Sequence, residues 1–236
     1  MTSSTSKQTG EHYEWKKSHY QSDRVAGGYD TARFESPSRQ RSNRRKFAAI
    51  SKALALAAAA GAPVRTALDL PCGTGRIFPL LTRHAIRFVG ADISSAMMHE
   101  AAGKCSEPTL FGGFIGCDAE RLPIKNAQFD AVISIRFLFH WPAEVRQRIM
   151  REFARASRHW VIVDYRHRYV LSYPFKALQH RLGWRTKPYR LPSYREIQED
   201  FRRAGIEIVK IIPTLVLFSN KWVILGKKIP PRADGA

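Results

Sequence analysis

The chain has 236 residues, enough for one α/β domain with a sizeable core and some appendages. It carries 39 Lys and Arg against 20 Asp and Glu, and the resulting net charge of +19 favours anionic partners without identifying one. Its three cysteines, an odd number without metal-ligand spacing, argue against a disulfide framework and predict a protein of the reducing cytoplasm.

The first two predicted segments precede the strands. Residues 1–45 are rich in Ser, Gln, Arg and Gly, and they predict a flexible leader whose second half is partly ordered. Residues 47–60 are rich in alanine and leucine, and they predict a helix that is ended by Gly61 and Pro63. Its alanine-rich part, residues 53–60, lies too deep in the chain for a signal peptide and is too short to span a bilayer.

A strand, a glycine turn and a helix are predicted at residues 67–76. The apolar residues 67–70 indicate a buried strand that contains Asp69, and the chain then turns through Gly73 and Gly75. Because glycine lacks a Cβ atom, the backbone can take positive φ and approach a ligand closely, and amides at the helix start offer donors. This pattern predicts a site for a nucleoside cofactor.

Two more acids follow later strands. Residues 88–94 form a second apolar run that contains Asp92. The number of residues between Asp69 and Asp92 is close to the sequence spacing at which an acid after the second strand reaches the ribose hydroxyls. A dinucleotide remains open at this point, although the third glycine of its fingerprint falls at Phe78, whose ring opposes close helix–strand packing. Asp118 then precedes a strand expected at residues 129–135. Three acids after successive strands suit an amine, a ribose and an adenine.

This series of motifs resembles the class I S-adenosylmethionine-dependent methyltransferases, especially the branch of the ubiquinone and menaquinone C-methylases and many small-molecule enzymes. The resemblance covers roughly residues 65–158 and extends more weakly to residue 228. It implies that S-adenosylmethionine is held by Asp69, Gly73, Gly75, Asp92, Ile93, Asp118 and Ala119. In this family the first acid and the turn hold the methionine part, the second acid binds ribose, and the residues after it and at the third acid meet adenine.

The resemblance has one departure and one extension. Pro71 stands where the family usually has its first glycine, and proline has no amide to donate, so the turn must begin one residue later. Residues 25–34, which include Tyr29, look like a tyrosine-bearing segment that folds over the cofactor mouth in related enzymes. We therefore expect an active-site lid in the leader, with Tyr29 near the substrate, and a surface linker is the alternative.

Repeated strand–helix units predict an α/β fold across residues 46–236, a Rossmann-like three-layer sandwich with a mostly parallel sheet. A helix is expected at residues 143–157 and a fifth strand at residues 160–164. Residues 206–217 and 221–225 flank a turn-like Ser-Asn pair and predict a hairpin. In the family that this chain resembles, such an antiparallel pair closes a seven-stranded sheet.

An insert at about residues 166–204 alternates Arg and Lys with Tyr, Phe and Trp. A capping box formed by Ser193 and Glu196 begins a helix near its end, and the loop-rich part before it should lie over the active site and shape substrate choice. Basic residues interleaved with aromatics can follow an RNA backbone, lie on an anionic membrane surface or bind an anionic metabolite. A solvated arginine-rich surface is the plain alternative.

The loop after the fourth strand should face the transferred methyl group. His140 is the best candidate base, because histidine titrates near neutral pH, and a structural role is its alternative. Arg136 is a candidate contact for an acidic substrate or the partner of a nearby carboxylate. Asp164, at the end of the fifth strand, is a candidate substrate contact or a loop cap. The sequence shows no Ser-His-Asp pattern and no metal cluster.

We therefore expect methyl transfer to a small-molecule or lipid-like acceptor, at oxygen or carbon. The enzyme should be a monomer or dimer in the cytoplasm or peripherally at the inner membrane surface. An RNA methyltransferase, suggested by the charge, is one alternative, although the lack of an Asn-Pro-Pro-Tyr-like motif weighs against exocyclic base nitrogens. Another alternative is a catalytically silent assembly factor that binds the cofactor or nucleic acid.

Overall fold

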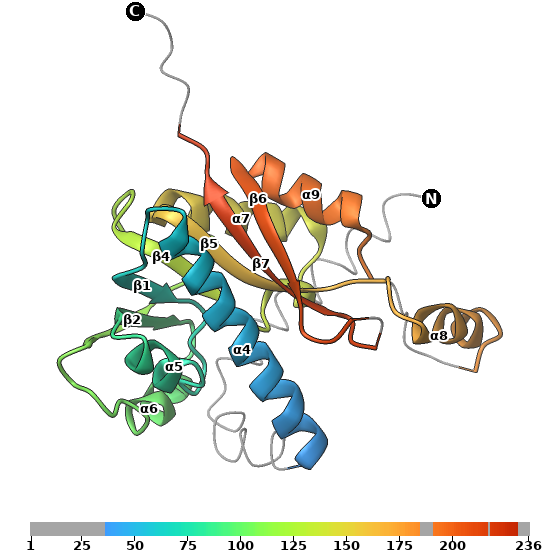
Figure 1. Cartoon of the computed structure of the whole chain (residues 1–236), viewed down its shortest axis with the longest axis horizontal. Coiled ribbons are helices and arrows are strands. Elements are labelled where there is room, and N and C mark those ends of the chain that lie inside the picture. Colours follow the sequence, from blue (N-terminus) through green and yellow to red (C-terminus); the bar gives the residue numbers. More distant parts are fainter. Residues whose placement is uncertain (1–35, 185–190, 217, 231–236) are drawn as a thin grey trace, which may run out of the picture.

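The computed structural model describes residues 36–184, 191–216 and 218–230, and Figure 1 shows how its elements are arranged. The helices are α4 Pro37–Ala59, α5 Phe78–Arg83, α6 Ser95–Ala102, the short 3-10 helix η1 Leu138–His140, α7 Ala143–Ala156, α8 Ser172–Arg181 and α9 Tyr194–Arg203. The strands are β1 Thr66–Asp69, β2 Arg87–Asp92, β3 Phe111–Gly116, β4 Phe129–Ser134, β5 Ser157–Arg166, β6 Ile206–Pro213 and β7 Lys221–Lys228.

The seven strands form one sheet in the order β3-β2-β1-β4-β5-β7-β6. The first five are joined by parallel pairs, whereas β7 runs antiparallel to both β5 and β6. This confirms the predicted Rossmann-like, mostly parallel sheet with an antiparallel C-terminal hairpin. Because β1 pairs with β2 on one side and β4 on the other, the chain order reverses there, and ligands in such folds bind at the carboxyl ends of these strands.

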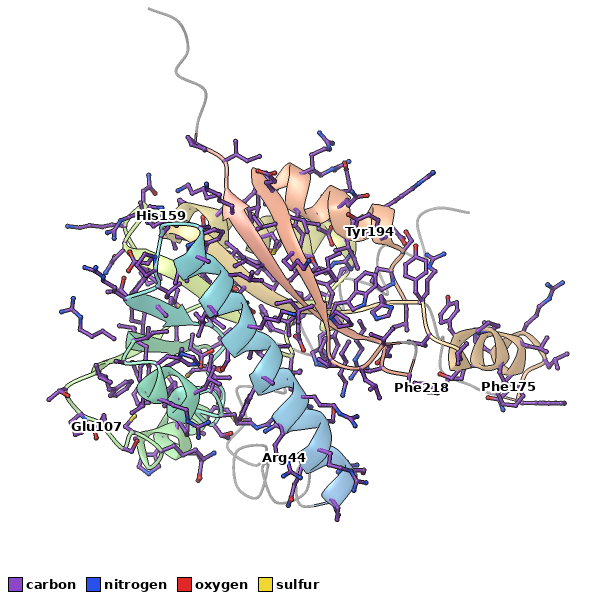
Figure 2. The ribbon with its side chains drawn as sticks, viewed as in Figure 1. Arg44, Glu107, His159, Phe175, Tyr194 and Phe218 are labelled. Atoms are coloured by element: carbon purple, nitrogen blue, oxygen red, sulfur yellow. The ribbon has the colours of Figure 1, made fainter. Side chains whose placement is uncertain are left out.

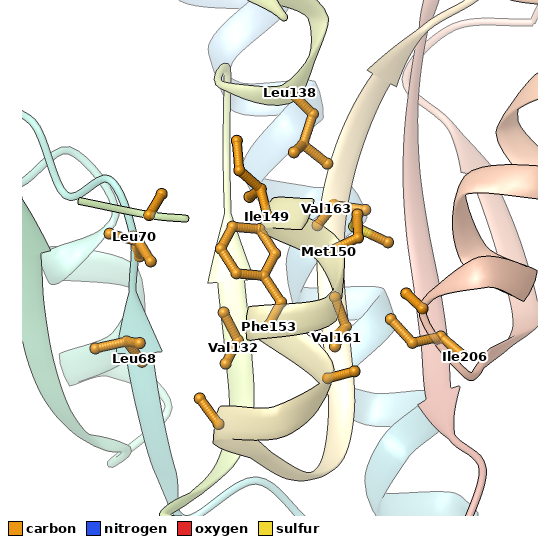
Figure 3. Packing of buried hydrophobic residues seen from close by; sticks show 14 of the residues in the cluster. Leu68, Leu70, Val132, Leu138, Ile149, Met150, Phe153, Val161, Val163 and Ile206 are labelled. Carbon is orange, nitrogen blue, oxygen red and sulfur yellow. The ribbon is translucent and has the colours of Figure 1, made fainter. Parts of the chain in front are cut away.

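Successive side chains along the central strands alternate between two buried faces of the sheet. Leu68, Val132 and Val161 lie on one face and pack with Ile149 and Phe153 of α7, as Figure 3 shows. The opposite face includes Ala67, Ala131 and Trp160, and it packs in one cluster with Ile50 of α4 and Phe78 of α5. Burial on both faces explains why these strands are continuous apolar runs in the sequence.

Helix α4 begins at Pro37, well before the start predicted at residue 47. Residues 37–45, which the sequence assigned to the leader, therefore belong to this helix. The early turns were missed because they are dominated by Arg, Gln and Ser and show no apolar stripe, although Arg and Gln are good helix formers. The buried stripe begins only at Lys46 and Ala49, so the first turns of α4 extend beyond the sheet (Figure 1).

Helix α9 has the predicted capping box, in which the Ser193 hydroxyl accepts from the Glu196 amide and the Glu196 carboxylate accepts from the Ser193 amide. The segment before it differs from expectation. Val170 and Leu191 are buried, but α8 between them buries no side chain and projects away from the sheet (Figure 1). A helix thus stands where a loop-rich covering segment was expected. None of the helices in the described ranges is long and apolar enough to cross a membrane.

Candidate active site

The turn after β1 is joined to β2 by backbone and carboxylate hydrogen bonds. The Cys72 amide donates to the Ala91 carbonyl at 2.8 Å, and the Gly73 amide donates to Asp92 Oδ2 at 2.8 Å. Gly73 and Gly75 have φ values of +52° and +71°, a region that residues with a Cβ atom rarely adopt. The sequence thus places glycine where the turn geometry requires it.

Gly75 also allows two elements to approach closely. A Cβ atom at this position would lie 2.9 Å from Phe78 Cδ2 and 3.0 Å from the Ala101 Cβ. The Phe78 ring is fully buried and packs against Phe88, with ring centroids 4.7 Å apart. The bulky ring that argued against a dinucleotide fingerprint is therefore a core side chain, and Gly75 leaves the space for it.

Asp69 and Asp92 are buried carboxylates at the ends of β1 and β2. Burial, followed by the charge of Asp92, raises the pKa of Asp69 well above its ordinary value. Burial also raises the pKa of Asp92, although the amides of Gly73 and Ser94 donate to its carboxylate and act in the opposite direction. Two buried carboxylates beside the same turn lower the stability of the fold unless a positively charged ligand offsets their charge.

A cavity of about 150 Å³ lies at the carboxyl ends of these strands. Its lining includes Asp69, Gly73, Asp92, Ile93, Asp118 and Ala119. Gly75 is absent from that lining, so its contribution is to the turn and to packing. Met97, Cys117 and Ile149 add apolar walls, and burial raises the pKa of the Cys117 thiol to about 11, which keeps it protonated at neutral pH.

The loop after β4 borders the same cavity with Arg136, Phe137, His140 and Trp141. Arg136, the second residue after β4, has a φ of +66°, a strained value for a residue with a long side chain. The strain is compatible with a specific hydrogen bond, because the Arg136 amide donates to Asp164 Oδ1 at 2.5 Å. The loop then forms η1, which places His140 beside Phe139 with ring centroids 4.2 Å apart.

Asp164 lies outside the first cavity and lines a second one next to it. It is buried and forms an ion pair and hydrogen bond with Lys46 of α4. Burial lowers the pKa of Lys46, and the Asp164 carboxylate opposes this shift. Asp164 therefore fixes both α4 and the Arg136 loop. Tyr29, the remaining candidate contact, lies outside the described residues.

Sequence reasoning missed several residues of this region. Lys46 was overlooked although it lies in the buried stripe of α4, where a lysine among alanines and isoleucine is itself a signal. Arg76, just after the turn, donates to Asn43 Oδ1 at 2.6 Å and ties α4 to the cavity. Lys221 at the start of β7 carried no local signal. In the described part of the chain, His, Cys, Asp and Glu form no group of three or more that could hold a metal ion.

Residues 67–159, which contain the turn, the three acids and the loop after β4, match a family model described as a methyltransferase domain. The chain carries a class I, S-adenosylmethionine-dependent methyltransferase domain. The match ends within β5, so the cofactor half of this methyltransferase lies inside it, whereas α4, α8, α9 and the C-terminal hairpin lie outside.

Solved structures share the whole fold. Magnesium protoporphyrin IX methyltransferase from Synechocystis PCC 6803, with bound SAH, has a TM-score of 0.67 at 20% identity and covers 87% of this chain and 97% of its own. A SAM-dependent methyltransferase from Thermotoga maritima, named as a possible histamine N-methyltransferase, has a TM-score of 0.58 at 19% identity and the same coverage, 87% and 97%. A putative methyltransferase from Haloferax volcanii, in complex with the Trm112 activator, has a TM-score of 0.54 at 18% identity over 76% and 90%.

Proposed function

We propose that this methyltransferase transfers the methyl group of S-adenosylmethionine to an oxygen or carbon atom of a small-molecule or lipid-like acceptor. The observation that carries the proposal is one cavity in which carboxylates from three successive strand ends meet Arg136 and His140 of the loop after β4. Acids suit the cationic cofactor, and the loop supplies groups for the acceptor. The magnesium protoporphyrin enzyme of the same fold agrees with a small acceptor.

The cofactor residues have separate proposed roles. Asp69, buried and next to a second acid, accepts from the ammonium group of the methionine part, which offsets its unfavourable burial. Asp92 accepts from the ribose hydroxyls, and Ile93 packs beside the adenine. Asp118, whose Oδ1 accepts from the Glu120 amide at 3.0 Å, lies with Ala119 at the adenine edge. S-adenosylmethionine would supply a methyl group bound to a positively charged sulfur, and S-adenosylhomocysteine would be the neutral leaving group.

His140 is the proposed base because it lines the cofactor cavity from the loop after β4. Its amide donates to the Phe137 carbonyl at 3.0 Å, which holds the short helix that carries the ring. A hydroxyl or acidic carbon of the acceptor placed between His140 and the methyl group would lose its proton to the imidazole. Phe137 and Trp141 enclose this position and limit the entry of water.

We also propose that the protein works in the cytoplasm and binds peripherally to an anionic membrane surface. Leu171, Phe175, Leu178 and Leu182 recur at helical spacing in and around α8 and are all more than half exposed. Figure 2 shows Phe175 and Phe218, both exposed, at the same side of the molecule. Lys176 and Arg181 supply positive charge in α8, which complements anionic headgroups.

The composition of this stripe favours lipid over RNA. Single-stranded RNA binds by stacking bases on aromatic rings, and three of the four stripe residues are leucines, which have no ring. Aliphatic side chains gain instead from entering the acyl boundary of a bilayer.

The experiment that tests the enzymatic proposal uses isotope-labelled S-adenosylmethionine and extracts of a strain that lacks this protein. We expect label in one metabolite or lipid whose unmethylated form accumulates in that strain, lighter by one methylene. Label in RNA alone would replace this proposal by the RNA methyltransferase. No transfer to any fraction, with intact cofactor binding, would favour a silent cofactor-binding protein.

Membrane binding is tested by sedimentation with phosphatidylcholine vesicles, with and without phosphatidylglycerol. A Phe175→Ser and Leu178→Ser double variant should bind anionic vesicles at least about tenfold more weakly, because each buried side chain contributes about 1.5–3 kcal/mol. Val209→Ser, an exposed apolar residue on β6, is the matched control and should bind normally. Equal binding of all three proteins would exclude α8 as the contact.

A further inference from the structure

A second cavity of about 410 Å³ lies beside the cofactor cavity. Its walls come from the first half of α4, the loop after β4, the end of β5 and the start of β7. The charged residues that line it are Arg39, Lys46, Arg136, Asp164, Arg166 and Lys221. Arg136 lines both cavities, so the two share part of one wall. This wall lies at the edge of the sheet where the methyl group is expected.

Cations outnumber carboxylates among the described residues that line this basic cavity. Five side chains in its lining are cationic and one is a carboxylate, and this carboxylate, Asp164, already forms the ion pair with Lys46. Other contacts hold the cations in place. Lys221 Nζ donates to Ser42 Oγ at 2.9 Å, and the Arg166 guanidinium lies 4.1 Å from the centroid of the Phe139 ring.

The crowding of like charges has a measurable consequence for Lys221. Burial, followed by the charges of Lys46, Arg166 and Arg136, lowers the pKa of Lys221 to about 8. The Asp164 carboxylate opposes this shift but does not cancel it. An anion in the cavity would relieve the repulsion between these cations, which are brought together by four different elements of the fold.

We propose that the basic cavity binds an oxyanion of the acceptor with at least two negative charges, a phosphate group or clustered carboxylates. This inference rests on the proposed function, because it makes the cavity the second half of the acceptor site. Guanidinium groups bind such oxyanions through paired hydrogen bonds, and lysines add point charges. The acceptor is thereby anchored by its acidic part in the basic cavity, while its reacting atom reaches past Arg136 toward His140.

The test uses titration calorimetry on the full chain saturated with SAH, with pyrophosphate and the tricarboxylate tricarballylate as separate probes. Lys221→Gln and Arg166→Gln should each weaken the preferred probe about tenfold or more, since each removes a charge-assisted contact. Lys227→Gln removes the same charge from an exposed position of the same strand and should leave binding unchanged. Lys221→Arg keeps the charge and should keep most of the affinity.

Two arms distinguish the sources of the oxyanion. Tighter binding of pyrophosphate than of tricarballylate supports a phosphate group, and the reverse order supports carboxylates. Vesicles of phosphatidylcholine with phosphatidic acid, offered to a Phe175→Ser and Leu178→Ser protein, show whether a lipid phosphate reaches the cavity without α8. Competition between these vesicles and pyrophosphate would support a lipid phosphate, and binding of soluble pyrophosphate without such competition would support a soluble acceptor.

The inference and the proposed function fail in different ways. If SAH binds but neither probe binds, or if the Lys221 and Arg166 variants behave like Lys227→Gln, the basic cavity is not an oxyanion site and the inference is overturned. If the probes bind and SAH does not, the cofactor proposal fails and the anion site stands. If Lys221→Gln has an altered thermal midpoint, Lys221→Arg is tested in its place. A Lys221→Arg protein that folds normally but no longer binds the probes would also contradict the inference.

Discussion

The cofactor cavity is lined by four carboxylates at or after the ends of three successive strands, Asp69, Asp92, Asp118 and Glu120. The charged residues of the basic cavity beside it are mainly Lys and Arg. The acids come from one continuous part of the chain, residues 69–120, whereas the cations come from α4, the loop after β4, β5 and β7. The acidic cavity suits the positively charged methyl donor, and we propose that the basic cavity holds a negatively charged acceptor at the same edge of the sheet. Arg136, which borders both, marks where the two ligands meet.

The largest expected effect concerns the place where the two cavities meet. If His140 takes the proton of the acceptor, His140→Ala lowers turnover by roughly 10²- to 10⁴-fold while cofactor affinity stays nearly unchanged. His159→Ala, on the far end of β5, is the control for loss of an imidazole. Turnover and thermal midpoint are measured on the same variant, and a destabilised enzyme with normal turnover would assign His140 a structural role.

A second expected effect concerns the ion pair that holds the basic cavity together. Lys46→Met should destabilise the fold by about 3–5 kcal/mol, because it leaves the buried Asp164 without its cationic partner. The double variant Lys46→Met and Asp164→Asn should recover most of this loss, since no buried charge remains unpaired. Urea unfolding provides the measurement, and Lys52→Met, on the exposed face of α4, is the control. If Lys46→Met were as stable as the control Lys52→Met, the ion pair would not organise this cavity.

A third expected effect concerns the acidic cavity. Asp92→Ala should weaken S-adenosylmethionine binding by about 1–3 kcal/mol, because the ribose hydroxyls lose a charged acceptor. The same change should leave the pyrophosphate affinity of the basic cavity unaltered, which is the comparison that matters. Calorimetry with both ligands measures this, with Glu107→Gln, an exposed acid, as control. Unchanged cofactor affinity would remove Asp92 from the site.

The acidic cavity could be predicted from the sequence and the basic cavity could not, for a physical reason. Asp69, Asp92 and Asp118 each follow or end an apolar run, and parallel strands bring their carboxyl ends to one edge whatever the rest of the chain does. Lys46 and Asp164 are 118 residues apart, and Lys221 and Ser42 are 179 apart, so only the packing of α4 on the sheet brings them together. No local spacing encodes that contact.

The segment before α9 shows the other limit of sequence reasoning. Alternating basic and aromatic residues were expected to cover the active site, yet among its described residues only Arg166 lines either cavity. No helix was predicted here, although the apolar residues of α8 recur at helical spacing, and periodicity does not say what a helix packs against. The buried anchors Val170 and Leu191 leave α8 outside the core, and its apolar stripe stays exposed.

The smallest expected effect is that the ligand affinities of the two cavities change in opposite directions with pH. In the acidic cavity the raised pKa of Asp69 means that acid protonates the carboxylate that the cofactor ammonium needs. S-adenosylmethionine affinity should therefore fall as the pH falls, by up to about tenfold per pH unit for each proton taken up. Asp69→Asn should remove this dependence along with part of the affinity.

The basic cavity should respond in the other direction. Lys221 faces Lys46 from α4, Arg136 from the loop, and Arg166 and Asp164 from β5, and it loses its proton near pH 8. The affinity for tricarballylate, whose carboxylates are all ionised above neutral pH, should fall as the pH rises through 8, by less than about tenfold because the arginines stay charged. Since the folded protein holds this proton less tightly than the unfolded chain, the contribution of Lys221 to stability rises from pH 8 to pH 10.5. Calorimetry of wild type and Lys221→Gln across this range measures the effect, and a profile that stays the same in the variant would show that another group controls the cavity.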